Sequence, residues 1–217
     1  MKNTPAIWGD GLKGLLKLSR GIDWINGRFG VIATWLVLIA CVVSAGNAAS
    51  RYLFSESSNG WLEAQWYMFA GMVMLGAPYT LRMNEHVRVD LLYGSVRERT
   101  RLWIDILGGL LFLLPICVIL IYFTWPWFLQ SWNIHEMSPN AGGLVRWPVY
   151  AMVPLGFSLL GLQGVSELIK RIGFLKGLCS DPGVKKQEKT AEEELAEVIR
   201  AREEAAAREA AAKGGAQ

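Results

Sequence analysis

Four long apolar runs, almost free of charged residues, constrain this chain of 217 residues more than any other feature. They cover approximately residues 29–52, 61–82, 102–132 and 147–169. The hydrocarbon core of a bilayer is roughly 30 Å thick, and about 20 apolar residues in a helix cross it. Because these runs leave little chain for a water-soluble core, we expect an all-α integral membrane protein with four transmembrane helices.

The segment before the first run, residues 1–27, has a different pattern. Lys13, Lys17 and Arg20 alternate with leucines, which predicts a basic amphipathic helix lying on the membrane surface. A disordered leader is the alternative. A signal peptide is disfavoured, because no small-residue cleavage site follows and the next apolar run is long enough to span.

The rest of the chain divides into a membrane domain and a tail. Residues 28–172 contain the four apolar runs, and residues 173–217 end in an alanine-rich stretch of mixed charge. Its i,i+4 pairs of glutamate with arginine or lysine predict a solvated helical tail. A coil that binds a partner is the weaker alternative.

Lysine and arginine residues are concentrated in the leader, in the connector 83–101 and just after the fourth run. The two other loops contribute little beyond Arg51 and Arg146. The positive-inside rule then places both termini and the connector in the cytoplasm. An even number of crossings agrees with this orientation.

Prolines and small residues predict bends and close helix contacts within the runs. Pro78 should kink the second run, and Pro115 and Pro126 should bend the third, which is too long for an upright crossing. Small residues let membrane helices approach each other closely. They gather in the first and fourth runs at Ala45, Gly46, Ala48, Ala49, Gly156, Gly161 and Gly164.

Six tryptophans lie near the ends of the runs and predict an aromatic belt at the membrane interface, with no ligand role required. They are Trp61, Trp66, Trp125, Trp127, Trp132 and Trp147.

The sequence lacks the cofactor-binding and catalytic motifs that are common in membrane enzymes. Both histidines, His86 and His135, fall in polar connectors, which argues against haem ligation within the helices. The three cysteines form no C-x-x-C pair, and no phosphate loop or zinc signature occurs. No ionisable residue clearly occupies the membrane midplane. We therefore expect no cofactor, no metal, no nucleic acid partner and no enzymatic activity, and we expect a scaffold that packs against another membrane protein.

The connector between the second and third runs carries closely spaced charges at Arg82, Glu85, His86, Arg88 and Asp90. Two interpretations stay open. In the first, the arginines serve only to keep the loop in the cytoplasm, and the acids neutralise some of them. Alternatively, the five residues fix the helical hairpin and form a contact with a partner subunit.

Five segments, in this order, resemble one known family. They are LEAQWYMF (62–69), LGAPYTLRMNEHVRVD (75–90), FLLP (112–115), MSPNAGGL (137–144) and PLGFSLLGLQGVSELIK (154–170). Together they are similar to the small permease subunit of TRAP transporters, the tripartite ATP-independent periplasmic transporters. The resemblance covers roughly residues 25–172.

The resemblance implies a three-part system in the bacterial inner membrane. A periplasmic solute-binding protein captures an organic acid, and a large permease subunit carries out sodium-coupled transport. The small subunit pairs with the large one, among membrane lipids, as a non-catalytic scaffold. The loop 133–146 either touches the binding protein or only joins two helices. The alternative for the whole chain is a four-helix anchor or scaffold of a redox or signalling complex.

Overall fold

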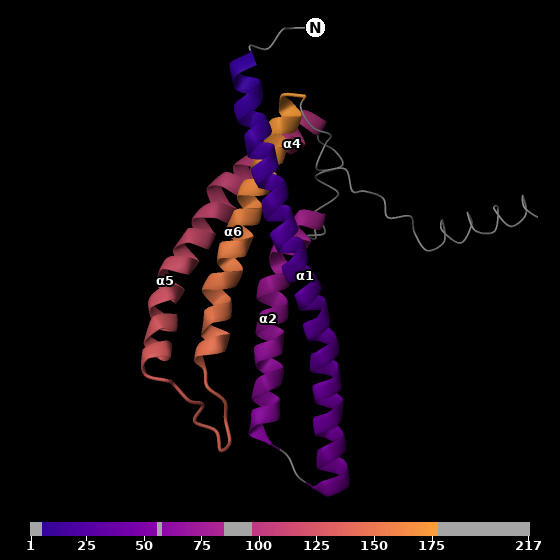
Figure 1. Cartoon of the computed structure of the whole chain (residues 1–217), viewed down its shortest axis with the longest axis vertical. Coiled ribbons are helices and arrows are strands. Elements are labelled where there is room, and N and C mark those ends of the chain that lie inside the picture. Colours follow the sequence, from indigo (N-terminus) through magenta and orange to yellow (C-terminus); the bar gives the residue numbers. More distant parts are fainter. Residues whose placement is uncertain (1–5, 56–57, 85–96, 178–217) are drawn as a thin grey trace, which may run out of the picture. The chain divides into compact units, whose positions relative to one another are not determined.

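The computed structural model describes residues 6–55, 58–84 and 97–177, and these residues are helical apart from their turns and one short hairpin. Figure 1 shows the helices α1 (Ala6–Phe54), α2 (Asn59–Met83), α4 (Glu98–Gly108), η1 (Gly109–Leu113), α5 (Leu114–Asn133) and α6 (Trp147–Leu175). The prediction of an all-α protein is confirmed for this part of the chain.

Three helical segments are long and apolar enough to cross a membrane. They are Gly14–Phe54, Arg99–Asn133 and Trp147–Leu175, the second of which joins α4, η1 and α5. Helix α2, with 25 residues, is not among them. The membrane character of the protein is therefore supported by three helices, and the crossing of α2 stays a prediction.

Helix α1 is a single helix of 49 residues. It continues without a break through the position where a separate amphipathic segment, residues 1–27, was expected to end. No proline interrupts it, and two of its glycines, Gly27 and Gly30, lie where α2 comes close. A Cβ atom on Gly30 would lie 2.6 Å from Cγ of Tyr79, and one on Gly27 would lie 2.6 Å from Nη1 of Arg82.

Around Pro115, where a bend was predicted, the structure has a π-helical segment, η1, directly before α5, and the bend itself stays a prediction. A proline within a helix lacks an N–H donor, and its ring clashes with the carbonyl four residues earlier. The wider π turn accommodates both effects without ending the helix. Pro126 lies inside α5 and Pro78 inside α2, where both were expected.

Helix α6 contacts α1, α2 and α5, and it lies between α2 and α5 in Figure 1. A small core forms where Ala33 of α1, Leu75 of α2 and Leu159 of α6 meet. A Cβ on Gly156 would lie 2.6 Å from Cβ of Met74, and one on Gly164 would lie 2.8 Å from Cδ2 of Leu113. The expected close packing of these two glycines is thus confirmed.

The small residues of α1 behave differently. A Cβ on Gly46 would meet nothing within 4 Å, and Ala45, Ala48 and Ala49 are exposed. The prediction that this stretch packs closely against another helix finds no such contact within the described chain.

Candidate functional site: two polar clusters at opposite ends of the helices

The loop between α5 and α6 is a short hairpin. Met137 and Val145 form an antiparallel bridge. The N–H of Ser138 donates to the carbonyl of Leu144 at 3.0 Å, and the N–H of Arg146 donates to the carbonyl of Glu136 at 2.9 Å. The glycine pair in the turn supplies the positive φ of 69° at Gly142, which residues with side chains rarely adopt.

A single carboxylate holds this hairpin to α2. Glu63 is only 4% exposed, and its side chain accepts three hydrogen bonds from the loop. The hydroxyl of Ser138 and the amide Nδ2 of Asn140, at 2.8 Å, both donate to Oε1. The backbone N–H of Leu144 donates to Oε2 at 2.7 Å. We call these four residues the Glu63 cluster.

Two further contacts attach the same hairpin to α2. Asn59 Nδ2 donates to the carbonyl of Ala141 at 3.2 Å, and the hydroxyl of Tyr67 donates to the carbonyl of Val145 at 3.0 Å. Because these donors sit on either side of Glu63 along α2, the helix start and the hairpin form one polar unit.

A second polar cluster joins the first half of α1 to the last half of α6. Asp23 Oδ1 accepts from Nε2 of Gln163 at 2.9 Å and from the hydroxyl of Ser166 at 2.8 Å. Its Oδ2 lies 3.1 Å from Nζ of Lys170. Asn26 adds a buried bond from Nδ2 to Oε1 of Gln163, at 2.7 Å.

The same cluster includes Ser19 and Glu167. The hydroxyls of Ser19 and Ser166 lie 2.7 Å apart. Glu167 Oε1 accepts from Gln163 at 3.0 Å and from Lys170. We call this set the Asp23 cluster; its seven members are Ser19, Asp23, Asn26, Gln163, Ser166, Glu167 and Lys170.

Two neighbouring contacts extend this end of the molecule to α2 and α4. Arg82 donates from Nη1 to the carbonyl of Asp23 at 2.9 Å. Arg171 of α6 forms a largely buried ion pair with Asp105 of α4, at 3.2 Å. This ion pair ties α6 to α4.

Of the five connector residues singled out in the sequence, the structure describes Arg82 alone. It sits in the last turn of α2, which ends at Asn84 in a left-handed conformation. Glu85, His86, Arg88 and Asp90 lie outside the described residues, so their role stays a prediction.

The six tryptophans all lie within about 12 Å of the hairpin end of their helices, measured along the helix axis. Trp127 stacks on Tyr150 with ring centres 4.4 Å apart, and Trp132 meets Trp147 edge to face at 4.4 Å. Trp61, Trp66 and Trp125 are at least half exposed. Their interface role remains a prediction, and their placement on one side of the molecule agrees with it.

Both clusters are suited to holding helices and loops in place. Glu63 and Asp23 each accept hydrogen bonds from three different residues of the chain itself, as a carboxylate with a structural role does. Among the described residues, no group of three or more His, Cys, Asp or Glu side chains is arranged to hold a metal ion.

Comparison with known protein families shows to which family of proteins the chain belongs. Residues 36–173 match the family described as tripartite ATP-independent periplasmic transporters, DctQ component. The chain belongs to this family. The DctQ match confirms the resemblance to the small TRAP permease subunit, and it lends no support to an anchor of a redox or signalling complex. No curated protein and no solved structure matched the chain.

The DctQ match includes all of the Glu63 cluster but leaves out the α1 half of the Asp23 cluster, which precedes residue 36. Membership makes the protein a small membrane component of a TRAP transporter.

The sequence contains signals for both clusters besides the charges of the connector. Glu63 is the single acidic residue in α2, and a lone acid in an apolar helix needs donors from elsewhere. Ser19, Asp23 and Asn26 recur at helical spacing on α1. The polar residues between 163 and 170 do so on α6.

Proposed function

We propose that this chain is the non-catalytic scaffold subunit of a sodium-coupled TRAP transporter for an organic acid. It pairs in the bacterial inner membrane with a large permease subunit, and a periplasmic solute-binding protein delivers the solute. The observation that carries the proposal is the family match over all of α2, α4, η1 and α5 and most of α6.

The uncovered side of η1 and α5 supports a role in assembly. Phe112, Val118, Tyr122 and Phe123 are between 65% and 73% exposed. In a membrane such a surface faces lipid or another subunit, and a second subunit could cover it without unfolding anything.

We also propose that α2 crosses the membrane, which gives four crossings in total. Glu63 and Arg82 stand at its two ends, about 28 Å apart along the helix axis. Glu167 of α6 is about 32 Å along the helix axis from Arg146, the residue that precedes this helix. Both separations are close to the roughly 30 Å thickness of the hydrocarbon core. The two polar clusters would then lie at the two membrane surfaces.

The distribution of charge supports cytoplasmic termini. The basic residues of the described chain gather at the Asp23 end, including Arg20, Arg82, Arg101 and Lys170, whereas the hairpin end holds Arg51 and Arg146. Fluorescent and phosphatase fusions at Gln217 test the orientation. A fusion that is fluorescent and lacks phosphatase activity is the expected result, and the reverse pattern would contradict it.

Co-purification tests the scaffold function. The tagged full chain, extracted gently from its native membranes, should bring with it a large multi-span permease identifiable by mass spectrometry. Liposomes that contain this chain alone should take up no organic acid, whereas both subunits together with the binding protein and a sodium gradient should do so. Uptake by the chain alone would overturn the proposal.

For the connector, we propose that Arg82, Glu85, His86, Arg88 and Asp90 fix the hairpin of the second and third crossings and contact the large subunit. The bond from Arg82 to the carbonyl of Asp23 attaches the start of the connector to α1. Asp90→Arg should lower recovery of the two-subunit complex while leaving membrane insertion intact. Normal recovery would leave the connector with orientation as its only role.

A further inference from the structure

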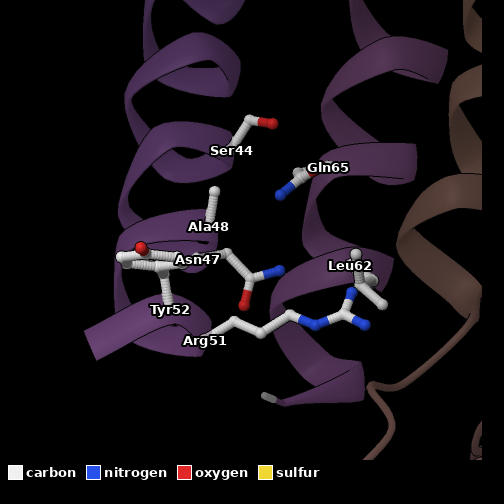
Figure 2. Close-up of a pocket in the computed structure, with 7 residues that line it drawn as sticks. All are labelled: Ser44, Asn47, Ala48, Arg51, Tyr52, Leu62 and Gln65. Carbon is white, nitrogen blue, oxygen red and sulfur yellow. The ribbon is translucent and has the colours of Figure 1, made fainter. Parts of the chain in front are cut away.

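A polar groove opens between the end of α1 and the start of α2, and none of its lining residues belongs to either cluster. It has a volume of about 430 Å³ and is lined by Ser44, Asn47, Arg51 and Tyr52 of α1 and by Leu62 and Gln65 of α2. Figure 2 shows the Asn47 amide and the Arg51 guanidinium reaching toward α2, while the Gln65 amide reaches toward α1.

The polar groups of this groove have no partners in the described part of the chain. No hydrogen bond or ion pair there involves the side chains of Ser44, Asn47, Arg51 or Gln65. These groups reach about 15 Å below the end of α1, into the region between headgroups and acyl chains. Unpaired polar groups at that depth are costly, so an occupant that accepts hydrogen bonds is favoured.

The chemistry of the lining residues favours an anion as the bound group. Arg51 supplies a permanent positive charge and several donors, and the two amides and the hydroxyl of Ser44 add neutral donors. No carboxylate is among the lining residues. A phosphate group fits this combination, because arginine binds its oxygens with charge-assisted hydrogen bonds.

The walls of the groove continue inward as an apolar surface. One or two turns deeper on the same helix faces lie Val37 and Cys41 of α1 and Phe69 of α2, all exposed. A polar pocket at the membrane surface that leads to an apolar surface below matches an amphiphile. We propose that this groove binds the phosphate of a phospholipid, with the acyl chains lying against α1 and α2 below it.

Native mass spectrometry of the purified, delipidated full chain tests this site by titration with phosphatidylglycerol. Arg51→Gln should weaken the binding roughly tenfold, the loss expected for one charge-assisted hydrogen bond. Arg99→Gln, an exposed arginine on α4, is the matched control and should bind as the wild type does. Phosphatidylglycerol should also raise the melting temperature of the wild type more than that of Arg51→Gln.

Two further probes separate the headgroup from the chains and from free phosphate. Diacylglycerol with the same acyl chains should bind weakly, and inorganic phosphate should not displace phosphatidylglycerol. Gln65→Leu, on the opposite wall, gives a second reading in case Arg51→Gln fails to fold. Equal binding of the two lipids, displacement by inorganic phosphate, or equal losses for Arg51→Gln and Arg99→Gln would overturn the proposal.

Discussion

The Glu63 cluster and the Asp23 cluster are both centred on a carboxylate, but they hold different parts of the molecule together. At the hairpin end, one carboxylate receives three donors from a loop that has little regular structure of its own. At the other end, two long helices share a network in which Asp23, Gln163 and Lys170 each make several contacts. The attachment of the hairpin depends on one side chain, whereas the attachment of α1 to α6 is shared among several side chains.

The clusters also differ in their relation to the family. The Glu63 cluster lies wholly within the segment that matches the DctQ family, whereas Ser19, Asp23 and Asn26 precede it. The hairpin and its attachment to α2 thus lie within the part of the chain that matches the family. The attachment of the first half of α1 adds to it.

The largest effect is expected from Glu63→Gln, because an amide offers two donors to a site built from donors. Cleavage of the hairpin 137–145 by an added protease should accelerate by roughly an order of magnitude, since the loop loses its main attachment. The rate is measured on the purified full chain by gel electrophoresis and mass spectrometry.

Glu136→Gln is the matched control for that experiment. This carboxylate belongs to the same loop, but its ion pair with Arg146 is partly exposed and 3.5 Å long. Exposed pairs contribute little, so its cleavage rate should stay near that of the wild type. Equal acceleration in both variants would show that the hairpin does not depend on Glu63.

The next largest effect is expected from the helix packing between the two clusters, where Gly156 of α6 meets α2. Gly156→Ala places a methyl group 2.9 Å from the backbone carbonyl oxygen of Met74, which cannot move without shifting α2. We expect a loss of about 1–3 kcal/mol in the free energy of unfolding, as for other overpacked sites. Unfolding by added detergent, followed by circular dichroism, measures it.

Gly161→Ala is the control on the same helix. Its Cβ would lie 3.5 Å from Cβ of Cys117, an ordinary contact, so the variant should be as stable as the wild type or slightly more so. If Gly156→Ala is equally well tolerated, α2 and α6 pack less tightly than the structure indicates.

Asp23→Asn probes the distributed cluster and should cost only about 1 kcal/mol of unfolding free energy. The amide keeps one acceptor for Gln163 or Ser166, and Lys170 retains Glu167 as a partner. The double variant Asp23→Asn with Glu167→Gln should cost more than the sum of the single ones, because Lys170 then loses both carboxylates. Additive losses would show that the network is not redundant.

The smallest effect is expected from Arg82→Gln, below about 1 kcal/mol, since one hydrogen bond to the carbonyl of Asp23 is lost. Arg97→Gln, an exposed arginine at the start of α4, is its control. If the loss in unfolding free energy is as large as that of Gly156→Ala, Arg82 contributes more to the stability of the fold than one local hydrogen bond. The same unfolding assay serves all of these variants.

The sequence by itself determined the helices, because long apolar runs in a membrane have few alternatives to helix formation. It also indicated the close contacts of Gly156 and Gly164, where a local property of one residue type decides the outcome. The family followed from five short segments in a fixed order. These features need no knowledge of which helices are neighbours.

Only the tertiary structure decided what the polar residues do. Glu63 and the loop residue Leu144 are far apart in the sequence, and so are Asp23 and Ser166, and a hydrogen bond across such a separation exists only after the helices have packed. The continuous course of α1 through residue 28 has the same origin, because α2 and α6 both contact its first half. The sequence shows that these residues are polar, and the packing of the helices determines which residues they bond to.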